Sequence, residues 1–563
     1  MQAQASLANR PTTPTEWRSV NWRKANRRVR NLRHRIFRAT TEGDYKKVRS
    51  LQKLMLRSYA NRLLSVRKVT QQNRGKHTAG IDQVVVKTPE GKGMMVDILS
   101  DFRAWRVQPT RRVYIPKSNG KLRPLGISTI ADRCLQMVVK TALEPEWEAK
   151  LEGSTYGYRP GRSCHDAVKK LYFMSLPKNK KHWVVDADLQ GCFDNIDQSF
   201  LLAKLERFPA RGLVKQWLQS GYVEYGRWQP TTAGTPQGNC ISPLLANITL
   251  HGMEKALGIT YDSRGRTNGK RGLAKYADDF VVMCESKADA EAAIEDLRPW
   301  LFERGLSFSE EKTQVVHLRE GFDFLGFNFR HYATPGRTKT GWKLLTKPSR
   351  KSIKSIKARL KEEWLNLSGK PVKEVVMRLN PIIRGWANYF RTGVASRTFS
   401  YLQDWMFKRQ QRYAHKRHPN RGPQWWYQKY WGRLNLDHCD NWVFGDKDSG
   451  SHLVKFTWFP IERHVMVKGR ASPDDPSLKE DWERRSTMKV KDLAPSRQKL
   501  AKRQKFKCPI CGESLLNGES LHIHHKTPRS KGGKDCFSNW LLLHQVCHQQ
   551  RHASQLKQRL GSA

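Results

Sequence analysis

The sequence has few acidic residues for its length and no long apolar run. Its 51 Asp and Glu stand against 103 Lys and Arg, so the 563-residue chain carries a formal net charge of +52. Self-repulsion of this size favours a polyanionic partner, of which nucleic acid is the first candidate. The sequence contains no run of about 18 apolar residues, as a membrane-spanning helix would need, and no isolated basic amphipathic anchor. These absences argue against a membrane partner.

Cysteine is also scarce, and an apolar leader is missing. The ten cysteines are mostly single and scattered, with one CxxC pair near the end. This pattern is typical of a reducing compartment with one metal site rather than of a disulfide framework. The N-terminal stretch MQAQASLANRPTTPTEW has no signal-peptide core. We therefore expect an intracellular, cytoplasmic protein.

Composition and periodicity divide the chain into several segments. Residues 17–67 combine helical apolar spacing with many arginines, as in WRKANRRVRNLRHR; this is either a solvated face or, as we favour given the charge, a phosphate-contacting helix. Short apolar strands alternate with helical stretches over 110–330, which predicts an α+β domain. Residues 349–435 are helical and basic, and 436–495 are irregular. We find no internal repeat.

Aspartates end two of the apolar strands. In HWVVDADL, Asp186 and Asp188 share one strand face by period-2 alternation, and in KYADDFVVMC a hairpin would present Asp278 and Asp279. An ordinary Asp-containing turn is the simpler interpretation of the second stretch. If the strands pair, the carboxylates converge and require a hard cation; magnesium fits best, and two such ions clamp a nucleotidyl transfer.

The C-terminal 60 residues hold most of the potential metal ligands. Cys508 and Cys511 form one pair, and His544 and Cys547 form a second pair at the same spacing. Two such pairs predict a structural zinc site, with a redox CxxC as the rival interpretation. Several further polar residues lie between or beyond the pairs, namely His522, His524, His525, Asn539, His548 and His552.

The motifs in this order resemble those of bacterial group II intron-encoded proteins. They read IPKSNGKLRPLGIST, YGYRPGRSCHDAV, DADLQGCFDNID, GTPQGNCISPLLANITL, YADD, GLSFSEEKT, FLGF and LNPIIRGWANYFRTG, followed by the HNH-like C-terminus. The resemblance implies a multidomain α+β protein with right-hand polymerase-like fingers and palm, a helical thumb (maturase domain) and a small zinc-containing ββα-metal (HNH) domain. The expected bounds are 1–70 for a basic helical extension, 71–345 for fingers and palm, 346–435 for thumb, 436–497 for a DNA-binding region and 498–563 for the HNH domain.

The same resemblance implies roles for individual polymerase residues. Asp188, Asp278 and Asp279 would bind magnesium, with Asp186 as a neighbour. Phe193 would screen out a ribose 2′-hydroxyl, although an ordinary core phenylalanine is the alternative. Lys117 and Arg123 would hold the triphosphate of the incoming dNTP, Gln237 would line the nucleotide pocket, Gly238 would let backbone approach closely, and Lys312 would lie near the leaving group. Arg384 and Arg391 would contact RNA, while most rings between them would lie in the core.

In the HNH domain, the resemblance implies that His525 is the general base. His524 and His548 would hold a divalent ion, and Asn539 would orient the metal-binding loop or His525. The run HIHH leaves the division of roles among His522, His524 and His525 open. An all-structural zinc ribbon with surplus histidines is the alternative.

The predicted function is that of a multifunctional intron-encoded protein. It would bind group II intron RNA, assist splicing, nick target DNA with its HNH domain and copy intron RNA into DNA from the nicked end. A splicing-only maturase with a vestigial polymerase is one alternative, and a reverse transcriptase of another system, such as phage defence, is the other.

Overall fold

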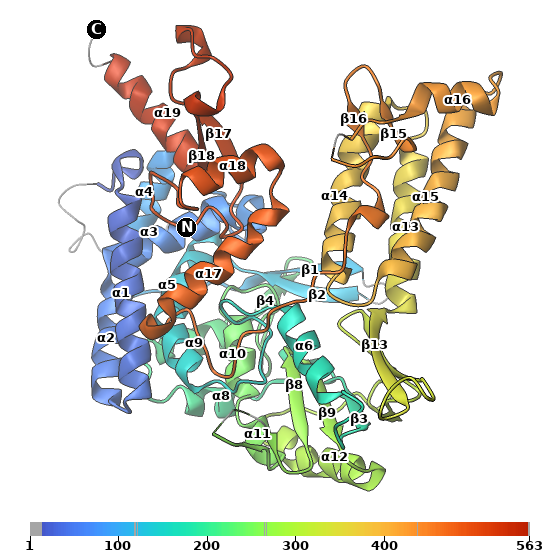
Figure 1. The fold of residues 1–563 in the computed structure, drawn as a ribbon. Coiled ribbons are helices and arrows are strands. Elements are labelled where there is room, and N and C mark those ends of the chain that lie inside the picture. The colour runs from blue at the N-terminus through green and yellow to red at the C-terminus, as the bar shows by residue number, and fades with distance from the viewer. Residues whose placement is uncertain are drawn as a thin grey trace.

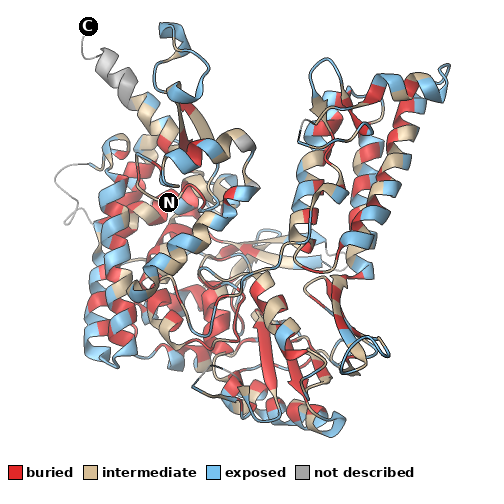
Figure 2. Ribbon diagram, in the orientation of Figure 1, coloured by how far each residue is buried: buried red, intermediate tan, exposed pale blue. Residues whose placement is uncertain are grey.

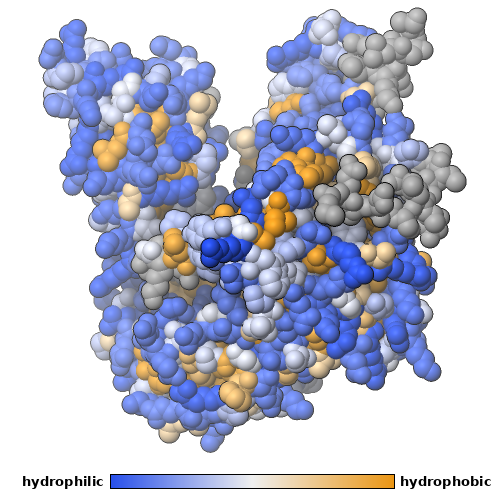
Figure 3. Space-filling view, turned by 180° about the vertical axis from the view of Figure 1, so that it is seen from behind, coloured by the Kyte–Doolittle hydropathy of each residue, from blue (hydrophilic) through white to orange (hydrophobic). Residues whose placement is uncertain are grey.

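The structure is a computed structural model that describes residues 14–560, except for 117–119, 121, 264, 266 and 436. Two upright parts rise from a common base (Figure 1). One carries the N-terminal helices and the C-terminal domain, and the other is helical. Seen from behind, the surface is hollowed between them and is largely hydrophilic (Figure 3). None of the helices in the described ranges is long and apolar enough to cross a membrane.

The N-terminal part is a helical bundle. Its helices are α1 (Trp22–Thr41), α2 (Tyr45–Arg57), α3 (Tyr59–Arg67), α4 (Pro89–Ile98) and α5 (Ile130–Lys150). Asn21, Asp44 and Ser58 cap the first three, because each side chain accepts a hydrogen bond from a backbone N–H of the first turn. The helical apolar spacing of residues 17–67 predicted a buried stripe, which is confirmed for Val29, Leu32 and Ile36 of α1, whereas Leu54 of α2 is 50% exposed.

Two four-stranded sheets form the base. The first has the order β2-β1-β4-β5, and the second has the order β10-β3-β9-β8. The strands of the first sheet are β1 (Thr110–Pro116), β2 (Leu122–Ile127), β4 (Tyr222–Glu224) and β5 (Arg227–Gln229). Those of the second sheet are β3 (Trp183–Ala187), β8 (Gly272–Tyr276), β9 (Asp279–Cys284) and β10 (Gln314–His317).

Helices and shorter strands surround these sheets. The helices are α6 (Cys164–Met174), α7 (Cys192–Asn195), α8 (Gln198–Lys204), α9 (Arg211–Gln219), α10 (Ser242–Thr249), α11 (Met253–Ala256) and α12 (Lys287–Phe302). The strands are β6 (Thr260–Tyr261), β7 (Thr267–Asn268), β11 (Phe322–Phe324), β12 (Phe327–Ala333) and β13 (Trp342–Pro348). The alternation of strands and helices expected for residues 110–330 is therefore present.

The second sheet separates two hydrophobic cores. Val185 and Val282 face a core shared with the N-terminal bundle, whereas Val184 and Val281 face a core shared with the helical part. Alternation along the strands produces this division. Figure 2 shows the resulting buried strands in red. Both upright parts are thus packed, through separate cores, onto one sheet.

The helical part and the C-terminal segments complete the fold. The helical part contains α13 (Arg350–Asn366), α14 (Val372–Phe390), α15 (Ser396–Arg417) and α16 (Pro423–Tyr430), with strands β14 (Trp431–Gly432), β15 (Val443–Asp446) and β16 (Ser451–His452). After it come α17 (Lys479–Met488), α18 (Pro495–Arg503), β17 (Leu521–His525), β18 (Trp540–His544) and α19 (Gln545–Leu560). The expectation that 436–495 is irregular was wrong for β15, β16 and α17. The α17 helix is supported by the Asp481–Arg485 pair one turn apart.

Candidate functional sites

The structure places the predicted magnesium-binding carboxylates at one end of the second sheet. Asp188 directly follows β3, and Ala277 and Asp278 form the two-residue turn between β8 and β9, where Tyr276 pairs with Asp279. Because β3 pairs with β9, Ala187 lies opposite Phe280. The strand end and the hairpin turn are therefore neighbours, as the sequence predicted.

The acids of this site raise one another's pKa. The pKa of Asp279 is raised to about 7, first by loss of hydration and then by the charges of Asp278, Asp188 and Asp186. The pKa of Asp278 is also raised, first by burial and then by Asp188, while Arg123 and Lys312 oppose the shift. Burial raises the pKa of Asp186 to about 6. A divalent cation would relieve this accumulation of negative charge, so the donor set fits such an ion.

Lys312 neutralises part of this charge. Its ammonium group pairs with Asp188, and this hydrogen bond is the main reason why its pKa is raised. The oxygens of Asp188, Asp278 and Asp279 do not all lie within 4.8 Å of one another, in contrast to two Cys/His groups elsewhere in the described residues. The carboxylates interact electrostatically without forming a closed ligand set.

A pocket of about 410 Å³ lies between the first sheet and the loop that precedes α10, and none of the four aspartates lines it. Phe193 and Gln237 both line it, and the Gln237 amide donates to Asp194 Oδ2 at 3.0 Å. Gly238 has φ +113°, and a Cβ there would lie 3.0 Å from the carbonyl oxygen of Gly126. This close approach of backbone is the one expected at Gly238. Two predicted nucleotide-binding residues thus share one pocket.

Two basic residues were expected to bind the triphosphate. Arg123 lies on β2, is exposed and acts electrostatically on Asp278. Lys117 lies outside the described residues. Arg123 therefore presents its positive charge toward the carboxylates.

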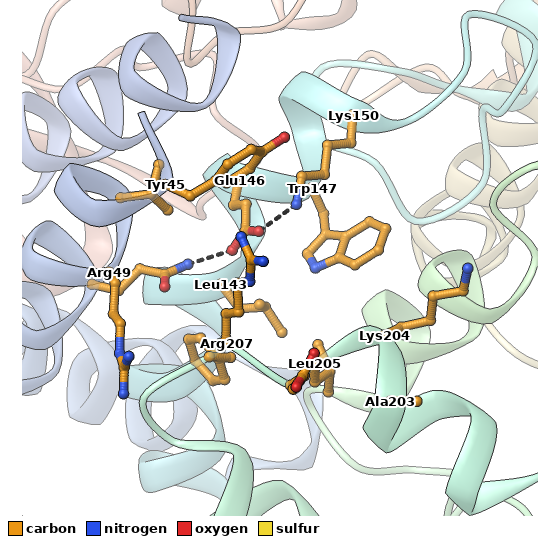
Figure 4. A pocket seen from close by; sticks show the side chains of 14 residues that line it. Tyr45, Arg49, Leu143, Glu146, Trp147, Lys150, Ala203, Lys204, Leu205 and Arg207 are labelled. Atoms are coloured by element: carbon orange, nitrogen blue, oxygen red, sulfur yellow. Dashed lines mark hydrogen bonds and ion pairs between the residues drawn. The ribbon is translucent and has the colours of Figure 1, made fainter. Parts of the chain in front are cut away.

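Another pocket, of about 240 Å³, lies among α2, α5 and the end of α8 (Figure 4). At its centre the Glu146 carboxylate accepts hydrogen bonds from Lys150 at 2.5 Å and from Gln52 at 2.6 Å. None of the predicted site residues lines it. We assign it no part in the chemistry.

The helical part holds the two predicted RNA-contacting arginines on or just after α14. Arg384 is exposed, whereas Arg391 forms an ion pair with Glu462 and is only 18% exposed. The rings between them pack inward, with Trp386 and Phe390 centroids 4.4 Å apart. Arg384 is therefore more accessible than Arg391 for contact with a phosphate.

The C-terminal domain contains a compact Cys/His set. Cys508, Cys511, His544 and Cys547 are buried, and their ligand atoms all lie within 4.8 Å of one another. His544 Nδ1 lies 3.3 Å from Cys511 Sγ, and its Nε2 lies 3.1 Å from the Ser514 carbonyl oxygen. Three thiols and one oriented imidazole, closed to solvent, fit a structural zinc ion.

Three histidines form a second potential ligand set. His524 on β17 meets His548 and His552 on α19, and their ligand atoms also lie within 4.8 Å of one another. Both ring nitrogens of His524 are buried without a hydrogen-bond partner in the described chain. Burial, followed by the charge of Arg551, lowers its pKa to about 4. A neutral imidazole with free nitrogens is suited to a metal ion.

His525 points to different partners from His524, because the two side chains alternate on β17. Its Nε2 lies 2.6 Å from Asp535 Oδ1, and the Trp540 indole N–H donates to the same nitrogen at 3.0 Å. The Asn539 amide donates to the carbonyl oxygens of Thr527 and Lys534, both at 3.0 Å, and so ties together the loop between β17 and β18.

Comparison with protein families covers most of these parts. Residues 17–99 match the N-terminal domain of reverse transcriptase, and residues 115–329 match reverse transcriptase (RNA-dependent DNA polymerase). Residues 353–431 match the group II intron, maturase-specific domain, and residues 508–554 match HNH endonuclease. The chain belongs to the group II intron-encoded proteins.

Two bacterial relatives are similar to parts of this chain. Protein YkfC of Escherichia coli (strain K12) is 34% identical over 47% of this chain and 79% of its own length. Group II intron-encoded protein LtrA of Lactococcus lactis subsp. cremoris is 30% identical over 46% of this chain, and the match spans about half (53%) of LtrA. Telomerase from Candida albicans, a solved structure, covers 57% of this chain and 60% of its own at a TM-score of 0.31, too low for an inference. The prediction of reverse transcriptase, maturase and HNH endonuclease domains is confirmed.

Two contacts in this intron-encoded protein were not predicted from the sequence. The sequence analysis assigned the divalent ion to His524 and His548 and gave His552 no role, although the spacing of His548 and His552 places both on one helix face. The contact of Asp535 with His525 had no signal in the sequence, because it depends on the path of the loop between β17 and β18.

Proposed function

We propose that this intron-encoded protein performs target-primed reverse transcription of a group II intron and assists splicing of that intron. The fingers and palm would be formed by the two four-stranded sheets and their helices, and the thumb by α13–α16. The HNH domain would have a ββα-metal arrangement built from β17, β18 and α19. Residues 436–497 would contact target DNA.

The observation that carries the polymerase assignment is the pairing of β3 with β9. It brings the end of β3, with Asp188, beside the hairpin of Asp278 and Asp279, and the pocket lined by Phe193 and Gln237 would receive the incoming nucleotide. Magnesium ions held by these carboxylates would supply the charge that activates a primer 3′-hydroxyl and stabilises the leaving pyrophosphate. Arg123 and Lys117 would hold the triphosphate, and Phe193 would exclude a ribose 2′-hydroxyl.

Lys312 adds to this proposal. Because it pairs with Asp188 and is 64% exposed, its ammonium group can exchange that carboxylate for a phosphate. We place it near the leaving group of the incoming dNTP.

In the HNH domain, the buried Cys508, Cys511, His544 and Cys547 support a structural zinc ion. His524 and His548, joined by His552, would hold the divalent ion that neutralises the cleaved phosphodiester. His525 would accept a proton from the attacking water, with Asp535 orienting its ring and Asn539 holding the loop in place.

The bound intron RNA would be the template for DNA synthesis, and its binding would also assist its splicing. The net charge of +52 favours extensive phosphate contacts. Arg384 is exposed on the helical part and supports such a contact, whereas Arg391 would first have to leave Glu462. The same charge supports retention of the excised intron lariat as a ribonucleoprotein.

Primer extension on an RNA template with magnesium and deoxynucleotides tests the proposal. The wild type should synthesise DNA, and Asp278→Ala should not, while both bind intron RNA equally. Lack of synthesis by the wild type, with intron RNA bound and spliced, would indicate a splicing-only maturase. Co-purification of an RNA unrelated to group II introns would indicate a reverse transcriptase of another system.

A further inference from the structure

The HNH domain packs its cysteine-bearing turn against the N-terminal helices. Arg23 of α1 donates to the Pro509 carbonyl oxygen at 3.2 Å, and Arg30 of α1 pairs with Glu513 at 2.5 Å. The Gln550 amide of α19 donates to the carbonyl oxygens of Arg18 and Val20. In Figure 1 this domain rests on the upper end of the N-terminal helices. The two parts are joined on several sides.

Apolar packing accompanies these polar contacts. Cys508, Cys511 and Cys547 belong to the same hydrophobic core as Trp22 and Val66 of the N-terminal helices. The predicted zinc site is therefore at the seam between two domains that are far apart in sequence, rather than inside an independent finger.

Arg67, the last residue of α3, reaches the ligand set itself. Its Nη2 donates to Cys547 Sγ at 3.6 Å and lies 3.3 Å from Glu519 Oε2. Its guanidinium carbon lies 4.7 Å from the centroid of the Trp22 ring, and the side chain is only 3% exposed. The guanidinium group is thus buried between one domain's tryptophan and the other domain's cysteine.

The charge of the metal site explains why a cation belongs there. Three thiolates, one neutral imidazole and Zn²⁺ leave one net negative charge, which is costly to bury without a partner. Arginine remains protonated in such surroundings, and a hydrogen bond to a ligand thiolate fixes its orientation. The nearby Glu519 carboxylate adds a further negative charge. Arg67 therefore offsets the charge of both this carboxylate and the metal site.

We propose that Arg67 is a positioning residue of the zinc site, contributed by the N-terminal helices, and that zinc binding and docking of the HNH domain onto these helices stabilise each other. This inference rests on the structural zinc proposed above. It follows that zinc holds the nicking site at a fixed place on the polymerase, and that its loss loosens α1 as well as the HNH domain.

Zinc release to a chelating dye tests the role of Arg67 in the full-length protein. Arg67→Met keeps the side-chain length but removes the charge and the donors. The control is Arg62→Met on the same helix, whose guanidinium group donates to the Arg57 carbonyl oxygen and lies over Tyr59. We expect Arg67→Met to release zinc about 10–100-fold faster than the control, the range typical of lost partners of metal ligands. Arg67→Lys should fall between them.

Hydrogen exchange of the wild type tests the docking without a substitution. Removal of zinc should speed amide exchange in residues 22–41 of α1, while α14 in the other upright part stays unchanged. Unchanged exchange in α1, or equal zinc release by the two Met variants, would overturn the inference. A wild type that purifies without bound zinc would refute the proposed zinc site itself, so metal content is measured first.

Discussion

Lys275 offers a direct test of how the proposed catalytic hairpin is supported. It lies on β8, three residues before Asp278, and its side chain is fully buried. The ammonium group donates to the Leu250 carbonyl oxygen at 2.5 Å and lies 3.5 Å from Glu152 Oε2. Its backbone also exchanges hydrogen bonds with Ser154 and Tyr156, both at 2.9 Å. Lys275 therefore holds the chain around residues 152–156 against the hairpin.

Lys275→Met should lower the free energy of unfolding by about 3 kcal/mol. Removing one partner of a buried ion pair costs about 3–5 kcal/mol, because the other charge stays buried. Here the lower end applies, since Glu152 Oε1 still accepts hydrogen bonds from the backbone N–H groups of Gly252 at 2.8 Å and Glu254 at 3.1 Å. Adding Glu152→Gln removes the unpaired charge but keeps an acceptor, and should restore part of the loss.

The assay is urea unfolding monitored by tryptophan fluorescence. DNA synthesis is measured on the same preparations. Lys270→Met serves as the control, because Lys270 is an exposed lysine five residues earlier. The variant should unfold at a lower urea concentration than the control and lose activity as its hairpin loosens. A midpoint equal to that of the control would refute the ion-pair reasoning.

Three further predictions concern the proposed sites. Because the pKa of Asp279 is raised to about 7, protons compete with magnesium for its carboxylate below that pH. The magnesium concentration for half-maximal DNA synthesis should therefore rise up to about tenfold for each pH unit below 7. A magnesium requirement that does not change with pH would contradict this. His525→Ala should abolish nicking of target DNA while extension of a supplied 3′ end continues, and unchanged nicking would mean that another histidine is the base. Asn539→Ala removes both side-chain hydrogen bonds across the loop and should increase amide hydrogen exchange in that loop. It should also slow nicking by about 10–100-fold, as the loss of supporting contacts does at metal sites. An unchanged nicking rate would argue against a supporting role.

Local patterns predicted much of this architecture. The spacing of Val29, Leu32 and Ile36 predicted the buried stripe of α1, and the alternation around Asp186 predicted strand β3. Both signals arise from periods of 3.6 and 2 residues, which depend only on near neighbours. The α17 helix was missed because its burial pattern is weak: no side chain described within it is buried.

The sequence by itself determined the chemical inventory of this protein: its cationic surface, the aspartates that end paired strands, and the cysteine and histidine spacings of the C-terminal domain. Those features follow from residue identity and short-range geometry. Only the tertiary structure decided which distant groups meet. Lys312 with Asp188, Asp535 with His525, and Arg67 with Cys547 come together because the packing of strands, loops and domains sets contacts that no local spacing encodes.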